Sequence, residues 1–225
     1  MLVKGCRLLM VMVLFLTLPA CAGSLTYSAE AIEARVIDAD TKQPLEGVVV
    51  TANWQLEQGT VGGNVPVGQL MVMETVTDKE GRFSFSAWGP KTARESFLVN
   101  DDPQLLLFKS GYDYQRLNNP YSSDRELRLR PMRHSVWNKR VIVMKAFKGT
   151  LDEYARQLSF FMTDVRFIED DCNWKTVPKL IMALQNQKEA FRAAGIIRTF
   201  YSVDYLPTNE SECGSPKDFF RNYAP

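Results

Sequence analysis

The spacing of apolar residues changes once along this chain of 225 residues, from every second position to every third or fourth. From Ile32 to Val36, apolar and polar residues alternate, which is typical of a strand with one buried face. From Leu151 the apolar residues recur at the spacing of one helix face. We therefore predict a β-sheet unit over residues 32–148 and a helical unit over residues 149–225.

Further strands are predicted where β-branched and aromatic residues gather between turn signals. They cover residues 48–54, 71–77, 83–86, 105–108, 127–129 and 136–144. In one of the intervening turns, Asp78 is expected to accept a backbone hydrogen bond and Gly81 to adopt a positive φ. Short strands at this spacing predict an antiparallel β-sandwich.

Two turns of the β-sheet unit carry specific motifs. Their residues are Val36, Ile37, Asp38, Thr41, Pro44, Leu45, Gly47 and Val48, then Thr77, Asp78, Gly81, Phe83 and Phe85, with Gly111 and Tyr112 further on. Together they resemble the opening of carboxypeptidase regulatory-like domains, over about residues 32–130. The resemblance implies a transthyretin-like, immunoglobulin-like β-sandwich of about seven strands. It also implies a module that is usually non-catalytic and that scaffolds, or binds protein or carbohydrate. It assigns no binding residue, because the motif positions are turn and core positions.

Residues 1–20 have the composition of an export signal. Lys4 and Arg7 are followed by an uncharged apolar run of eleven residues, Leu8–Leu18. Such a run is too short to span a bilayer of about 30 Å as a helix. We expect this segment to be removed as a signal peptide, and residues 21–31 to form a polar tether ahead of the fold.

The residues Leu18-Pro19-Ala20-Cys21 resemble the lipobox of bacterial lipoproteins. The resemblance implies cleavage after Ala20 and acylation of Cys21 on its sulfur and its new amine, with palmitate-like chains. Two or three acyl chains anchor a protein stably without a transmembrane helix. Because Ala22 follows, the resemblance implies an outer-membrane lipoprotein that faces the periplasm. The alternative is an ordinary secreted protein in which Cys21 is a free thiol.

The four cysteines reduce to one pair in the mature chain. Cys6 leaves with the signal peptide and Cys21 is expected to carry lipid, so Cys172 and Cys213 remain. An even number of cysteines in an oxidising compartment predicts a disulfide between these two. Two unpaired buried thiols are the alternative.

The helical unit carries signals for two helices. Thr150 and Glu153 have the spacing of a capping box, which predicts that a helix begins there. A second helix is predicted from near Thr176, with Pro178 in its first turn and Gly195 after its end. The short connection predicts an antiparallel helical hairpin, with the disulfide holding the C-terminal tail across its tip. This unit resembles no family that we recognise.

Charge and histidine content exclude several classes of function. The chain has 27 Lys and Arg against 26 Asp and Glu, a net charge of +1, which argues against nucleic-acid binding by bulk charge. His134 is the single histidine, so zinc sites built on two imidazoles are excluded. No Gly-x-Ser-x-Gly motif occurs. We therefore assign no catalytic residue, and we expect neither a metal site nor a cofactor.

A cluster of arginines is one candidate for binding. It could meet phosphate groups or an acidic envelope partner, and it comprises Arg128, Arg130, Arg133 and Arg140. The alternative is a strand face that its arginines merely keep solvated.

A long, glycine-rich insertion is the second candidate. It lies between Trp54 and Met71, and loops of this length are often functional. We expect Trp54, Gly62, Gly63 and Asn64 to edge a ligand groove. The alternative is a mobile loop at one end of the sandwich.

These observations predict a non-enzymatic, lipid-anchored protein of the cell envelope. Its β-sandwich would bind a protein or a glycan, or give structural support. One alternative is an enzyme that acts on a cell-wall polymer with carboxylates such as Glu57 or Glu74, which requires two acids about 5 to 9.5 Å apart. A second alternative is an accessory subunit of an envelope complex, with an exposed helix face as its interface.

Overall fold

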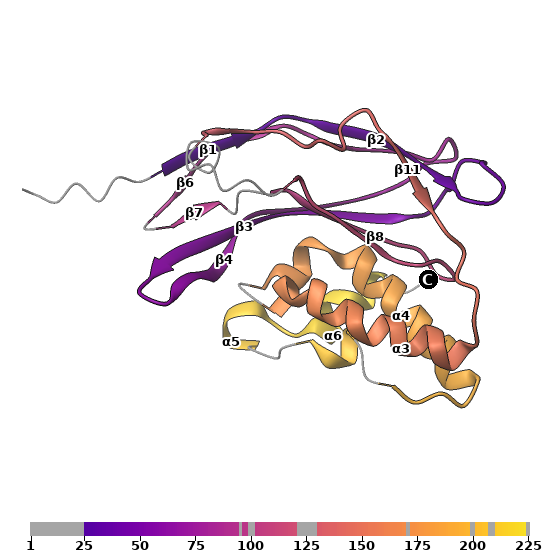
Figure 1. Cartoon of the computed structure of the whole chain (residues 1–225). Helices are drawn as coiled ribbons and strands as arrows, with labels where there is room; N and C mark the ends of the chain where they lie inside the picture. Colours follow the sequence, from indigo (N-terminus) through magenta and orange to yellow (C-terminus); the bar gives the residue numbers. More distant parts are fainter. Residues whose placement is uncertain are drawn as a thin grey trace, which may run out of the picture.

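The computed structural model describes residues 25–94, 96–98, 102–120, 130–169, 172–198, 201–206 and 210–223. They form three layers, in which two β-sheets lie face to face and helices cover the outer face of one sheet (Figure 1). The predicted antiparallel β-sandwich followed by a helical part is confirmed. The predicted strand at 127–129 lies outside the described residues.

The strands are short except for one long pair. Their bounds are β1 Leu25–Ala29, β2 Ile32–Asp38, β3 Val49–Thr60, β4 Gly63–Val76, β5 Arg82–Phe85, β6 Trp88–Ala93, β7 Phe97–Leu98, β8 Gln104–Phe108, β9 Gln115–Leu117, β10 Met132–Arg133 and β11 Val141–Met144. One layer contains β10-β1-β6 and β11-β2-β5. The other has the order β4-β3-β8-β9, and β7 also pairs with β3. Most pairs are antiparallel, but β10 and β11 run parallel to β1 and β2.

The helices follow the strands in the sequence. Their bounds are α3 Leu151–Asp164, α4 Pro178–Ala193, α5 Glu210–Cys213 and α6 Pro216–Phe220, with short 3-10 turns η1 Arg166–Glu169, η2 Asn173–Thr176, η3 Val203–Tyr205 and η4 Arg221–Tyr223. The capping box of Thr150 and Glu153 is present at the start of α3. Tyr154 near the start of α3 contacts Phe191 near the end of α4, with ring centroids 5.7 Å apart. The two helices therefore run antiparallel, as predicted.

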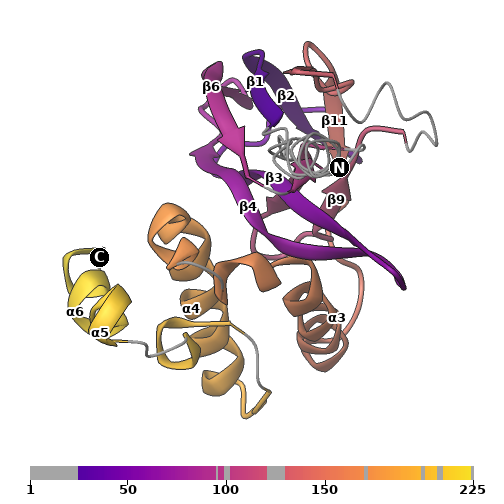
Figure 2. The same ribbon diagram turned by 90° about the vertical axis from the view of Figure 1, so that its left-hand side faces the viewer.

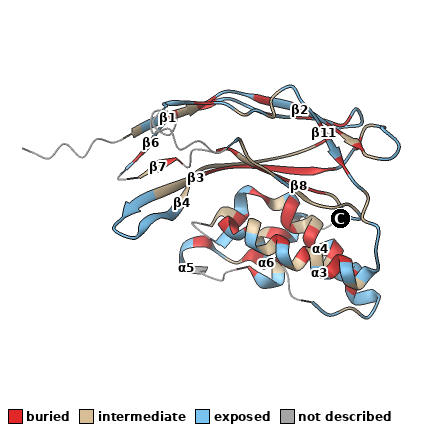
Figure 3. Cartoon of the chain, in the orientation of Figure 1, coloured by how far each residue is buried: buried red, intermediate tan, exposed pale blue. Residues whose placement is uncertain are grey.

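Strand β8 separates two hydrophobic cores. Leu105 and Leu107 face the interior of the sandwich, whereas Leu106 and Phe108 face the helices. Side chains alternate across a strand, so a strand covered on both faces is apolar at nearly every position. Figure 3 accordingly shows buried residues both on β8 and on the helices beneath it. The helices complete the fold by covering a face that would otherwise be exposed.

The residues of the two turn motifs build one hydrogen-bonded corner. Asp38 Oδ1 accepts from the amides of Thr41 at 2.7 Å and Asp40 at 2.9 Å, and Asp38 Oδ2 accepts from the hydroxyl of Tyr112 at 2.9 Å. The Thr41 amide and the Tyr112 hydroxyl hold the pKa of Asp38 at about 2. Thr77 binds the turn between β2 and β3, since its hydroxyl donates to Leu45 O at 2.6 Å.

The predicted roles of Asp78 and Gly81 are confirmed in the same corner. Asp78 Oδ1 accepts from the amides of Glu80 at 3.0 Å and Arg82 at 2.8 Å. Gly81 has φ 71°, and a Cβ there would lie 2.3 Å from Val36 O. These motif residues therefore stabilise the backbone of the turns, as expected of turn and core positions.

Two segments predicted to be irregular are strands. The tether predicted for residues 21–31 is wrong from Leu25 onward, because β1 pairs with β6 and β10 and buries Tyr27 and Ala29. The glycine-rich insertion is also not a loop. Strands β3 and β4 continue through it as a paired ribbon up to Thr60 and Gly63.

The strand predicted at 136–144 is shorter than expected. Only Val141–Met144 forms β11. Before it, the chain turns at Lys139, which has φ 59°, and the amide of Arg140 donates to Trp137 O at 3.2 Å. This turn brings Lys139 and Arg140 to the outer face of the sheet.

Candidate functional site

A groove of about 550 Å³ lies along the β11-β2-β5 sheet and extends past β5 to Thr75 and Val76 of β4 in the other layer. Strand β2 contributes Glu33 and Arg35, which alternate with inward-facing residues of the core. Strand β5 contributes Arg82, and the turn before β11 contributes Lys139 and Arg140. The groove therefore combines outward positions of three strands that are far apart in the sequence.

The groove carries more positive than negative side chains. Arg35, Arg82, Lys139 and Arg140 line it, against the acids Glu33 and Asp78. All four cations are exposed, and none forms an ion pair with a carboxylate of the described residues.

Two of these arginines are direct neighbours on adjacent strands of the sheet. Arg35 is the register partner of Arg82 in the antiparallel β2–β5 pair. Arg35 Nε donates to Glu80 O at 2.9 Å. Like charges placed directly opposite one another on adjacent strands destabilise a sheet. A bound phosphate or carboxylate would remove this repulsion and would fit the planar guanidinium groups.

The predicted arginine patch is assembled only in part. Arg140 lies in the groove, and Arg130 is exposed but is not part of the groove lining. Arg128 lies outside the described residues. Arg133 is 5% exposed, so its assignment to a surface patch is wrong.

The environment of Arg133 explains its burial. Its guanidinium lies 5.1 Å from the ring centroid of Tyr27 and donates to Leu98 O at 3.3 Å. Burial lowers the pKa of Arg133, and the charge of Asp102 opposes this effect. Arg133 therefore supports the end of the sandwich.

The predicted ligand loop is also not formed as expected. Trp54 is 1% exposed and packs edge-on against Trp88 at 5.2 Å, so it does not edge a groove. The end of the ribbon exposes Gly62, Gly63 and Asn64. The side-chain amide of Asn64 donates to Glu57 Oε2 at 3.2 Å. Trp54 faces inward because β3 places it on the same face as the core residues Val50 and Ala52.

The two acids considered for catalysis, Glu57 and Glu74, lie far from each other. Glu74 accepts from the amides of Leu180 at 2.7 Å and Lys179 at 2.9 Å at the start of α4. In the β3–β4 register Glu57 is opposite Pro66 and Glu74 is opposite Thr51. The six-residue separation of Thr51 and Glu57 along β3 corresponds to roughly 20 Å. Glu57 and Glu74 therefore do not form a glycosidase-like pair of acids.

His134 is part of a surface ion pair. Its Nδ1 lies 2.9 Å from Glu30 Oε2, and both side chains are more than half exposed. Within the described part of the chain, no three potential metal-ligating side chains form a group. In the same part, no helix has the length and apolar character needed to cross a membrane.

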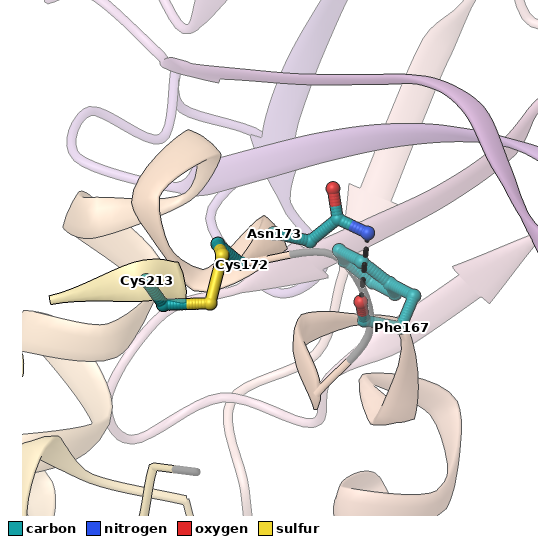
Figure 4. The surroundings of a disulfide bond; sticks show 4 residues. All are labelled: Phe167, Cys172, Asn173 and Cys213. Carbon is teal, nitrogen blue, oxygen red and sulfur yellow. Dashed lines mark hydrogen bonds between the residues drawn. A yellow bond between two sulfur atoms is a disulfide. The ribbon is translucent and has the colours of Figure 1, made fainter. Parts of the chain in front are cut away.

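The predicted disulfide between Cys172 and Cys213 is confirmed. Their Cα atoms are 5.4 Å apart, and the bond joins the connection between the main helices to α5 (Figure 4). The adjacent Asn173 donates to Phe167 O at 3.1 Å and to Gln69 Oε1 of β4 at 2.9 Å. The C-terminal tail is thus linked to a segment that is itself attached to the sheet.

Comparison with known proteins finds only distant structural likenesses. No family model and no curated protein matches the chain. A 3-chlorocatechol 1,2-dioxygenase from Rhodococcus opacus 1CP is similar over 54% of this chain and 61% of its own, with 12% identity and a TM-score of 0.32. A streptococcal ancillary pilin is similar over 53% of this chain and 30% of its own, with 15% identity and a TM-score of 0.25.

A third similar structure is the backbone protein of pilus 2b from group B streptococcus. The similarity covers 52% of this chain and 41% of that protein, with 12% identity and a TM-score of 0.27. Each of the three matches spans less than two thirds of the other protein. At these TM-scores the likenesses carry no argument about function, and the argument has to come from the chain's own residues.

Proposed function

We propose that the chain is a lipid-anchored, non-catalytic module of the bacterial cell envelope that binds an anionic partner in the groove of the β11-β2-β5 sheet. The lipobox-like residues Leu18 to Cys21 support the anchor, and Ala22 supports the outer membrane as its location, facing the periplasm. The disulfide between Cys172 and Cys213 is consistent with an oxidising compartment.

The observation that carries the binding proposal is the Arg35–Arg82 pair. The two arginines are register partners, and neither forms an ion pair with a carboxylate of the described residues. Lys139 and Arg140 add positive charge along the same groove. The partner therefore carries clustered carboxylate or phosphate groups, as an envelope glycan or an acidic protein surface does.

Co-sedimentation with isolated cell-wall sacculi tests the groove, because sacculi are an insoluble glycan that carries carboxylates. We expect salt-sensitive binding of the wild-type protein, and binding about tenfold weaker or more for the double variant Arg82→Glu with Arg140→Glu. The matched control, Arg192→Glu with Lys217→Glu, reverses two exposed charges on α4 and α6 and should bind like the wild type.

A protein partner is tested by crosslinking in intact cells. A photoreactive residue in the groove at position 84 should capture an acidic envelope protein that the same residue at the helical position 159 does not capture. Captured partners are identified by mass spectrometry. If sacculi binding is absent or unaffected by the groove variant, and no partner is specific to position 84, the groove proposal is wrong.

The anchor is tested independently by Cys21→Ser. This variant should move from the membrane fraction to the soluble periplasmic fraction, because it lacks the sulfur that carries the lipid. If it stays bound to the membrane, the lipobox interpretation is wrong.

A further inference from the structure

The paired strands β3 and β4 project beyond the sandwich as a two-stranded ribbon. Strand β7 pairs with β3 only at Leu56 and Glu57. Beyond Glu57, the described part of the ribbon is paired only with itself, up to Thr60 and Gly63. The four residues from Gln58 to Val61 extend it by roughly 13 Å.

The end of the ribbon exposes three valines and has no charged residue beyond Glu57. Val61 is fully exposed, and Val65 and Val67 are 41% and 43% exposed. The chain contains no charged residue between Glu57 and Glu74. Strand β4 is also an edge of its sheet. Exposed edge strands of proteins in water usually carry charged residues, which keep them from associating. The absence of charge here indicates that something covers the ribbon.

The ribbon lies at the end of the molecule where the described chain begins. Leu25 pairs with Ala93, and Ala93 lines a cavity of about 430 Å³ together with Leu56, Gln58 and Val67 of the ribbon. The start of β1 and the end of the ribbon point to the same side in Figure 1, and this side faces the viewer in Figure 2.

The tether and the ribbon have similar reach. Three residues lie between Cys21 and Leu25, and the four residue-to-residue steps of an extended chain span at most about 14 Å. The ribbon extends by a comparable distance from the same end of the fold. A lipid chain on Cys21 would therefore hold the end of the ribbon at the membrane surface.

We propose that the end of the ribbon, with Val61, Val65 and Val67, inserts into the boundary between headgroups and acyl chains of the membrane that anchors Cys21. This inference rests on the proposed lipid anchor. The insertion is shallow, because the free backbone groups of β4 need water or headgroups as hydrogen-bond partners.

The end of the ribbon, as a second membrane contact besides the lipid on Cys21, orients the molecule. Arg35 lies ten residues beyond Leu25 along β1 and β2, and in Figure 1 β2 and β11 lie toward the side opposite the end of the ribbon. With the ribbon end in the membrane, the groove of the β11-β2-β5 sheet is held away from the lipid surface. It then faces a partner in the periplasm and not the headgroups of its own membrane.

Fluorescence quenching on the full-length lipidated protein tests the insertion. An environment-sensitive dye is attached to Val61→Cys, and the protein is placed in vesicles of phosphatidylcholine that carry quenchers at known depths; this lipid has no net charge and so does not recruit the cationic groove. Protein without the introduced cysteine is treated with the same dye in parallel, so that any labelling of a bare Cys21 is measured and subtracted. Val141→Cys on β11 is the matched control, because Val141 is also an exposed strand valine and lies opposite Arg35.

We expect a blue-shifted emission and strong quenching by shallow lipid quenchers at position 61, and neither at position 141. The mass of the purified protein reports in parallel whether Cys21 is acylated. If Cys21 is acylated and position 61 is not quenched, the insertion is wrong and the anchor stands. If Cys21 is bare and position 61 is quenched, the anchor is wrong and the insertion stands; with neither, both are wrong. A blue shift that grows with protein concentration and is insensitive to the lipid quenchers would indicate a second copy on β4, and it would overturn the insertion.

Discussion

Glu74 of β4 accepts a hydrogen bond from the backbone amide of Leu180 at 2.7 Å, so a strand side chain caps the start of α4. The residue before the helix, Val177, has no side-chain acceptor, and Pro178 has no amide hydrogen. The Glu74 carboxylate therefore takes the role that Ser, Thr or Asp usually has at a helix start. Its negative charge also interacts favourably with the positive end of the helix dipole. This contact joins the helical unit to the sandwich.

Replacement of Glu74 should loosen that junction. Glu74→Ala should lower the free energy of unfolding by about 1–2 kcal/mol, because two amides at the start of α4 lose their acceptor. Glu74→Gln should lose less, since one amide oxygen remains. Urea denaturation followed by circular dichroism measures the change. Glu57→Ala on the same pair of strands is the control, and a loss as large for Glu57→Ala would contradict the capping role.

The corner around Asp38 should make stability depend on acid pH. Hydrogen bonds from Thr41 and Tyr112 lower the pKa of Asp38 from 3.8 to about 2. Between these values the unfolded chain binds more protons at this site than the folded chain does. The contribution of Asp38 is therefore fully present above pH 3.8 and is lost as the pH falls toward 2.

Unfolding of wild-type protein and Asp38→Asn between pH 2 and pH 5 measures this effect. The slope of unfolding free energy against pH should be smaller in the variant, and Tyr112→Phe should lie between the two. Asp204→Asn, at an exposed carboxylate near Lys188, serves as the control. An unchanged slope in Asp38→Asn would show that the corner does not hold this carboxylate ionised.

Two glycines with similar φ should respond differently to alanine. Gly111→Ala has open space around the new Cβ, so its effect should be about 1–2 kcal/mol, from the left-handed backbone alone. In Gly81→Ala the Cβ would lie 2.3 Å from Val36 O, a backbone atom within the sandwich. Thermal unfolding should therefore show a clearly larger destabilisation for Gly81→Ala. Equal effects at the two positions would contradict the tight approach at Gly81.

Reduction of the disulfide should destabilise the C-terminal tail. The bond closes a separation of 41 residues, which corresponds to about 4 kcal/mol in the chain-entropy model. The double variant Cys172→Ser with Cys213→Ser should unfold at lower urea concentration than the wild type. Treatment of the wild type with a thiol reductant should give the same shift, and it should leave the double variant unchanged. A wild-type protein that is insensitive to reductant would contradict the proposed contribution.

Local signals in the sequence predicted much of the fold correctly. The capping box at Thr150, the helix stop at Gly195 and the turn residues Asp78 and Gly81 all act within a few residues of the chain. The predicted disulfide followed from the number and compartment of the cysteines. Strand β1 was missed although Leu25, Tyr27 and Ala29 alternate with polar residues, because the segment was interpreted as a tether.

The candidate site was harder to predict. The alternation around β2 already indicates that Arg35 points outward, but nothing local shows that Arg82 will be its partner. Arg133 was assigned to the surface by its charge, and only the packing of Tyr27 and Leu98 around it shows that it is buried. The run Leu105–Phe108 indicated a strand, and its apolar residues on both faces were the signal that a second layer covers it.

By itself, the sequence determined where several strands and the two main helices form, where several turns lie and which cysteines pair, because periodicity, caps and turn residues act over short distances. Only the tertiary structure decided that the helices cover β3 and β8, that Glu74 caps α4 and that Arg35 meets Arg82. These contacts join residues that are tens of positions apart or more, and they depend on which faces of the strands the rest of the chain leaves to be buried.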